Sequence, residues 1–104
     1  MAEQPDNTET ILASSVRVPD HVVYRDFAEE TVMLNLDSGM YHGLNRTAAR
    51  MVDTLQSSAS VAAAVDALAS EFEQPHERIE QDVLSLCRTL DERGLIVRDA
   101  DRAG

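Results

Sequence analysis

Lysine is missing from this sequence, so arginine supplies all nine basic residues, against 19 aspartates and glutamates. The formal net charge of the 104-residue chain is −10 at pH 7. Binding to nucleic-acid phosphates or to anionic membranes requires a basic surface. The charge balance therefore argues against nucleic acid and against membranes as partners.

Cysteine is equally scarce, because Cys87 is the single one and an intramolecular disulfide is excluded. Cys87 falls on the apolar stripe of a predicted helix, where a small buried hydrophobe is a more frequent role than a nucleophile. The three histidines lack the close spacing of zinc or iron ligands; they are His21, His42 and His76. The sequence thus predicts no metal, no cofactor and no catalytic residue, and a protein that is not an enzyme.

Long apolar runs are also absent, since none approaches the roughly 20 residues of a membrane-spanning helix. The first ten residues, MAEQPDNTET, are acidic and polar, unlike a secretory signal peptide. We therefore expect a cytoplasmic protein with one small domain over residues 15–98. Residues 1–14 and 99–104 are expected to be disordered tails.

The most informative stretch is residues 30–50, ETVMLNLDSGMYHGLNRTAAR, which indicates a β-hairpin followed by a helix start. Residues 31–36 alternate between two faces, as in a strand with one buried side. Three apolar residues share one phase of this alternation, and we expect them to be buried: Val32, Leu34 and Leu36. The opposite phase, expected to face outward, carries Thr31, Met33 and Asn35.

The hairpin turn is predicted at residues 37–39, Asp-Ser-Gly, where Gly39 can adopt a positive φ. A second strand over residues 40–44 ends at Asn45, whose side-chain oxygen can cap a helix. One edge of this strand has a partner in the hairpin, and the other is open to a strand from another molecule. The pattern leaves undecided which N–H groups point to the open edge: those of Tyr41 and Gly43, or those of Met40, His42 and Leu44.

The remaining sequence predicts a short extended segment, a further strand and three helices. The extended segment covers residues 16–18 and the strand residues 21–27. Helices are expected over residues 46–55, from a cap at Ser60 to about residue 73, and over residues 76–93, where Gly94 ends the last one. The core stripe expected on that helix consists of Ile79, Val83, Leu86, Cys87 and Leu90. Strands followed by helices predict an α+β fold of winged helix-turn-helix type, with a three-stranded antiparallel sheet before three helices.

A second face of the last helix carries charged residues and one leucine at helical spacing: Glu80, Leu84, Arg88 and Asp91. One interpretation is a solvated helix face with an isolated leucine. The other is the floor of a groove beside the strand at residues 40–44. Spacing alone does not decide between them.

The run LDSGMYHGLNRTAARM, followed by two helices and LDERGLIV, resembles the PqqD family of peptide-binding domains, also called RiPP recognition elements. The resemblance covers about residues 16–97 and is strongest to the stand-alone proteins of lasso-peptide biosynthesis. It implies a non-catalytic domain in which a leader peptide adds a strand to the edge strand and packs against the third helix. The peptide-binding residues so implied are Met40, Tyr41, His42, Gly43, Leu44, Glu80, Val83, Leu84, Cys87 and Arg88.

The resemblance also implies partners that process the precursor peptide. In a lasso pathway these are a cysteine-protease-like leader peptidase and an ATP-dependent cyclase. In the pathway to pyrroloquinoline quinone the partner is a radical enzyme, and a PqqD-type chaperone for such a pathway is an alternative function.

Two other classes of protein deserve comparison. A winged-helix DNA-binding regulator has the same predicted fold, but the helix that would enter a groove begins with Glu77, Glu80 and Asp82. An acyl carrier protein is suggested by the pair Asp37-Ser38, but Gly39 and the surrounding strands do not suit an all-helical carrier.

Overall fold

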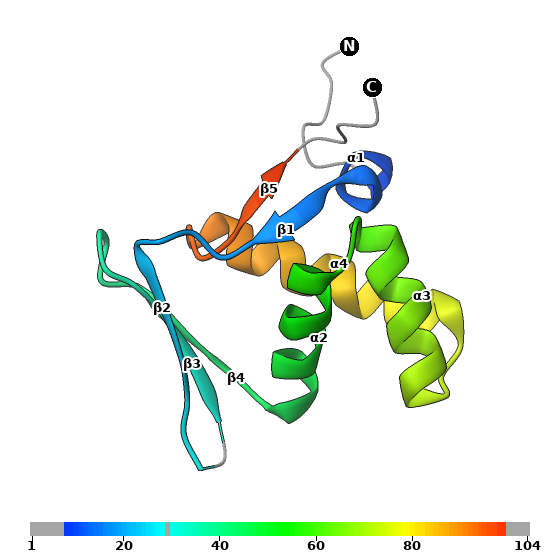
Figure 1. The fold of residues 1–104 in the computed structure, drawn as a ribbon, viewed down its shortest axis with the longest axis horizontal. Coiled ribbons are helices and arrows are strands. Elements are labelled where there is room, and N and C mark those ends of the chain that lie inside the picture. Colours follow the sequence, from blue (N-terminus) through cyan, green and yellow to red (C-terminus); the bar gives the residue numbers. More distant parts are fainter. Residues whose placement is uncertain (1–7, 29, 100–104) are drawn as a thin grey trace.

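The computed structural model describes residues 8–28 and 30–99 (Figure 1). Its helices and strands follow one another as α1 (Thr8–Ala13), β1 (Ser15–Arg17), β2 (Val22–Asp26), β3 (Thr31–Asn35), β4 (Tyr41–Leu44), α2 (Arg46–Ser57), α3 (Val61–Phe72), α4 (His76–Glu92) and β5 (Val97–Asp99). The predicted α+β class is confirmed, because a three-stranded antiparallel sheet precedes three long helices.

The strands form two separate sheets. β2, β3 and β4 pair in that order as an antiparallel sheet, which extends to one side of the helices in Figure 1. β1 pairs with β5 as a separate two-stranded sheet in the upper part of Figure 1, with Ser15 opposite Asp99. The sheet β2–β3–β4 therefore has β4 as one of its edges.

The predicted helix boundaries are confirmed by their capping geometry. Asn45 accepts a hydrogen bond from the backbone N–H of Ala48 at 2.8 Å, and Ser60 caps α3 in the same manner. After α4, Gly94 has a φ of 70° and its N–H donates to Asp91. The N–H of Leu95 reaches back to the carbonyl of Leu90, which completes a Schellman motif.

The prediction of a disordered tail is wrong for residues 8–14. Helix α1 forms there, and the side chain of Ile11 is 1% exposed within the core. Ser14 donates to the carbonyl of Thr10, and the carbonyl of Ser14 accepts from the N–H of Val61 at 2.8 Å. Asp99, expected in the other tail, belongs to β5. The remaining predicted tail residues, 1–7 and 100–104, lie outside the described residues.

The predicted orientation of β3 is also wrong. Met33 is completely buried and Thr31 and Asn35 are 6% exposed, whereas Leu36 is 59% exposed. Val32 and Leu34 are half-buried on the outer face of the sheet. The strand carries apolar residues in both phases, so alternation alone does not identify the buried one. The buried polar residues are accommodated because Thr31 donates to Asp26 at 2.6 Å and Asn35 makes several hydrogen bonds.

The second face of α4, which the sequence left open as a solvated face or a groove floor, is partly a core face. Leu84 is 5% exposed and belongs to the hydrophobic core, while Leu86, predicted for the core stripe, is only half-buried. Arg88 lies one turn after Leu84 and donates to Thr8 of α1 over 3.5 Å. Helix α1, which the sequence did not predict, thus packs near this side of α4.

Candidate functional site

The free edge of β4 has a defined set of backbone groups. The N–H of Asn35 donates to the carbonyl of Met40 at 2.8 Å, and the next N–H, that of Leu36, donates to His21 on the other side. Hydrogen-bonded and non-hydrogen-bonded pairs alternate along an antiparallel ladder. In the register of Met33 opposite His42, the backbone groups of His42 and Leu44 consequently face β3. The N–H and carbonyl groups of Tyr41 and Gly43 point to the free edge.

Side chains of β4 alternate between the two faces of the sheet. His42 lies opposite the buried Met33 and shares the inner face with Leu44. Tyr41 lies opposite Leu34 and is 66% exposed on the outer face. A strand added to this edge would likewise send alternate side chains inward and outward.

A groove of about 310 Å³ adjoins the inner side of β4. Its walls are β4, the first turns of α2 and the middle of α4. Apolar groups are contributed by Ala48, Met51 and Leu86, and the one carboxylate is that of Asp82. The other lining residues are His42, Asn45, Thr47, Ser85 and Thr89. A free strand edge and a partly apolar groove therefore lie side by side.

His42 connects the strand edge to this groove. Burial, and after it the nearby Arg93 guanidinium, lower the pKa of its imidazole. The ring therefore favours its neutral form, and Asp82 dominates the charge of the groove walls.

The predicted site residues separate into three groups. His42 lines the groove, and Met40, Tyr41 and Gly43 lie at the turn or on the outer face of the sheet. Glu80 is 3.8 Å from His76, and Arg88 reaches α1, so neither belongs to the groove. The remaining four are core residues with almost no exposed side-chain surface, and their role as peptide contacts stays a prediction: Leu44, Val83, Leu84 and Cys87.

Sequence reasoning did not identify most of the groove. On α4 its lining residues are Asp82, Ser85, Leu86 and Thr89, at spacings i, i+3, i+4 and i+7. Such spacing places residues on one helix face and was available from the sequence. The four were overlooked because Leu86 was assigned to the core, which shifted the predicted groove to the face of Leu84.

Cys87 has the properties of a packing residue. It is completely buried, and burial raises the pKa of its thiol to about 11. Thiolate formation is thus disfavoured, which opposes a nucleophilic role. Over residues 8–28 and 30–99, His, Cys, Asp and Glu form no group suited to a metal ion, and no helix there is long and apolar enough to cross a membrane.

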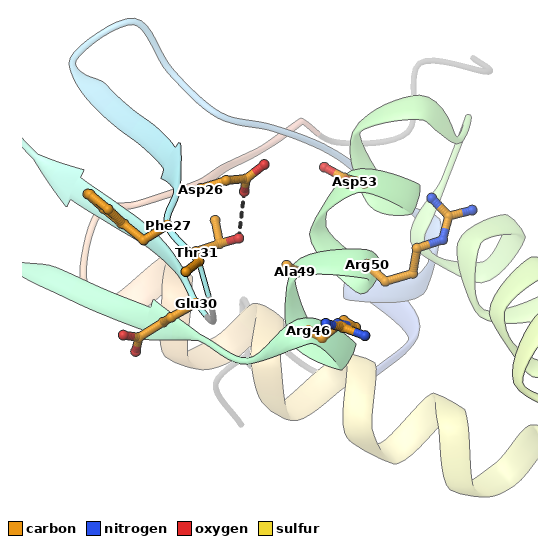
Figure 2. Close-up of a pocket in the computed structure, with 9 residues that line it drawn as sticks. Asp26, Phe27, Glu30, Thr31, Arg46, Ala49, Arg50 and Asp53 are labelled. Carbon is orange, nitrogen blue, oxygen red and sulfur yellow. Dashed lines mark hydrogen bonds between the residues drawn. The ribbon is translucent and has the colours of Figure 1, made fainter.

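A second depression, of about 330 Å³, lies between the β2–β3 turn and α2 (Figure 2). Its charged groups are largely engaged with neighbours. Asp26 accepts from Thr31, Arg50 forms a bidentate pair with Glu71 at 2.8–3.1 Å, and Asp53 accepts from Tyr24 at 2.9 Å. Burial and the Asp53 carboxylate raise the pKa of Tyr24, which keeps it a donor. These contacts hold the sheet and α3 to α2, so this depression has a structural explanation.

Known proteins share both the sequence pattern and the fold. The family described as coenzyme PQQ synthesis protein D (PqqD) matches residues 30–96. The solved structure of lasso peptide synthetase B1 complexed with the leader peptide is 30% identical, with a TM-score of 0.71, over 80% of this chain and 98% of that one. TbiB1 in complex with the TbiA(beta) leader peptide is 28% identical, with a TM-score of 0.68, over 77% of this chain and 93% of that one.

Among curated protein sequences, none matches this chain significantly. The family match nevertheless covers well over half of the chain and contains β3, β4 and the three long helices. Both of the similar structures are complexes with leader peptides. The chain therefore belongs to the PqqD family.

Proposed function

We propose that this chain binds the leader peptide of a ribosomally made precursor as an added strand on β4. The observation that carries the proposal is the free edge of β4, where the backbone groups of Tyr41 and Gly43 lie beside the groove. Strand addition obtains affinity from main-chain hydrogen bonds and specificity from pockets for alternate side chains. Both requirements are met at this one edge.

The spacing of sheets fits this arrangement. A strand added to β4 would lie about 4.8 Å away. It could bond to the N–H and carbonyl groups of Tyr41 and Gly43, with a net contribution of about 1 kcal/mol from each hydrogen bond. Leader side chains on the inner face would contact Ala48, Met51 and Leu86. The leader would thus be sandwiched between β4 and α4.

We further propose that the bound leader is presented to separate enzymes and that the domain itself does no chemistry. In the lasso type of pathway, which the similar structures favour, the enzymes are a cysteine-protease-like leader peptidase and an ATP-dependent cyclase. Holding a substrate near an enzyme raises its effective concentration without any catalytic residue in the adaptor. The alternative pathway, with a radical enzyme as the partner, is supported by the PqqD family match.

The test titrates fluorescently labelled TbiA(beta) leader peptide against wild type and two variants of one edge residue. Tyr41→Pro removes an N–H from the free edge, whereas Tyr41→Ala keeps the N–H and removes only the side chain. We expect Tyr41→Pro to weaken binding about tenfold, or about 1.4 kcal/mol, and Tyr41→Ala to weaken it less. Neither change should alter the melting temperature by more than a few degrees.

His42→Pro is the matched control, because the N–H of His42 faces β3. This variant should lower the melting temperature markedly. Equal affinities of wild type and folded Tyr41→Pro would place the peptide elsewhere. Leader binding itself would be refuted if wild type bound neither this leader nor any peptide from a displayed library of random 12-residue sequences.

A further inference from the structure

We infer that Glu30 is a specificity-determining residue, which selects leader peptides with a lysine or arginine on the outward face of the added strand, opposite Gly43. The inference rests on the proposed function. It adds a requirement for the charge of one residue of the peptide.

The first observation is the position of the Glu30 carboxylate over β4. Gly43 lies opposite Val32 on the outer face of the sheet, so a side chain at position 43 would point outward. Glu30 occupies that space instead, and a Cβ added to Gly43 would collide with its Oε2. Figure 2 shows the Glu30 side chain directed from the β2–β3 turn toward β4. Because Gly43 has no side chain, the carboxylate of Glu30, just before β3, can lie over β4.

The second observation is that the carboxylate is held near the edge but has no partner there. The backbone of Glu30 is fixed by two hydrogen bonds with Phe27, of 2.7 and 3.4 Å. Within the described residues, the Glu30 side chain is exposed and forms neither an ion pair nor a hydrogen bond. Arg25 is in the same cross-strand row as Val32 and Gly43, but it lies on β2, two strands away. A cation on an incoming strand would therefore find this carboxylate available.

The third observation is the direction of the free backbone groups. Because the N–H and carbonyl of Gly43 point to the open edge, a leader residue can pair directly with it. Directly opposite residues send their side chains to the same face, with Cβ positions about 5 Å apart. The leader residue opposite Gly43 would accordingly point outward, next to the Glu30 carboxylate. Lysine and arginine are long enough to span such a separation.

The same geometry orders the neighbouring leader positions. The residue opposite His42 would point inward to Ala48, Met51 and Leu86. The residue opposite Tyr41 would point outward and contact its ring. The leader motif so defined is an outward residue beside Tyr41, an inward apolar residue and an outward cation. An exposed ion pair of this type should change the affinity about two- to fivefold, or about 0.4–1 kcal/mol, within the range of exposed pairs.

The experiment selects peptides from a displayed library of random 12-residue sequences on four proteins: wild type, Glu30→Gln, Glu30→Arg and Glu9→Gln. Glu9→Gln makes the same chemical change on α1, far from β4 in Figure 1, and controls for net charge. Peptides selected on wild type and on Glu9→Gln should be enriched in lysine or arginine at one peptide position. That position is two residues away from the peptide residue that pairs with Tyr41. Glu30→Gln should lose this preference, and Glu30→Arg should replace it with aspartate or glutamate.

One selected peptide is then synthesised with its cation changed to glutamate. Wild type should bind this peptide about tenfold more weakly than the parent, and Glu30→Arg should bind it more tightly than the parent. Gly43→Ala, which displaces the carboxylate and keeps the edge N–H, should lose two- to fivefold for the parent peptide. All variants should melt within a few degrees of wild type.

The failure of this inference is distinguishable from the failure of the proposed function. Identical sequence preferences on wild type, Glu30→Gln and Glu30→Arg would show that Glu30 does not read the peptide, while strand addition would stand. Selected peptides that bind Tyr41→Pro as well as wild type would refute strand addition to β4, and the inference with it. A library that yields no binder would have the same consequence.

Discussion

The side-chain amide of Asn35 in β3 donates to the carbonyl of Gly94, just after α4, over 3.1 Å. The amide oxygen of the same residue accepts from the N–H groups of Asp37 and Ser38 at 2.9 and 3.2 Å. One side chain thus fixes the hairpin turn and ties it to the end of α4. A Cβ at Gly94 would lie 2.8 Å from the Asn35 nitrogen, so this approach depends on glycine.

Asn35→Ala should therefore destabilise the domain by about 2–3 kcal/mol, because it removes the hydrogen bonds to the backbone of Asp37, Ser38 and Gly94, each with a net contribution of about 1 kcal/mol. Chemical denaturation monitored by circular dichroism measures the effect. Leu36→Ala, at the exposed next position, should change stability by less than about 0.5 kcal/mol. Equal effects of the two changes would contradict the assigned orientation of β3.

The two leucines of α4 provide a second prediction. Leu84→Ala should cost about 3 kcal/mol, since it creates a cavity in the core. Leu86→Ala should cost about 1 kcal/mol, because Leu86 is half-buried, but it should weaken binding of the TbiA(beta) leader peptide severalfold. Denaturation and peptide titration of both variants separate the two roles. If Leu86→Ala destabilised the domain more than Leu84→Ala, Leu86 would be the core residue, as the sequence predicted.

Cys87 should behave as packing without chemistry. In the folded protein its thiol should resist alkylation by iodoacetamide at pH 8, because it is buried and its pKa is raised to about 11. Modification should become fast in denaturant. Cys87→Ala should cost about 1 kcal/mol through the small cavity that it leaves. Rapid alkylation under native conditions would show that the site opens.

The pH dependence of stability should contain a contribution from His42. Because the folded protein lowers the pKa of this imidazole, the unfolded chain takes up a proton at higher pH than the folded one. The free energy of unfolding should consequently fall as pH decreases through the ordinary histidine pKa of 6.5. Thermal melts between pH 7 and pH 5 should show a smaller decline for His42→Asn than for wild type. Parallel curves for the two proteins would contradict this assignment.

Duplex DNA should not bind this chain at physiological salt. The chain carries a net charge of −10, and Glu77 and Asp82 are exposed near the start of α4. Fluorescence anisotropy with a labelled random-sequence duplex measures the affinity. Sub-micromolar binding with a steep salt dependence would favour a regulator over a peptide-binding protein.

The elements that the sequence predicted correctly are those with local signals. Asn45, Ser60 and Gly94 act on backbone groups within a few residues of themselves, so the ends of the three long helices are recognisable without tertiary structure. The hairpin was recognisable for the same reason, because the turn at residues 37–39 lies between two short strands.

The elements that the sequence did not predict depend on distant contacts. Helix α1 has a single fully buried residue, Ile11, and is held by packing against α3 and α4. Which face of α4 buries Leu84, and which side of β3 is buried, depend on the elements that pack against them. The periodicity of the sequence does not show those elements. The free edge of β4 was predicted, but the choice of Tyr41 and Gly43 as its outward N–H groups required the register.

The pairing of β1 with β5 makes the two ends of the domain mutually dependent. Ser15 and Asp99 are neighbours in space, although nearly the whole domain separates them in the sequence. The segment that carries the family pattern, residues 30–96, excludes β1 and the whole of its partner strand, β5. A polypeptide trimmed to that segment would expose the core around Ile96 and lose Ile11 and Val16 from it. The cooperative folding unit of this protein is therefore longer than the segment that matches the family. Removal of either β1 or β5 should unfold the strand that pairs with it.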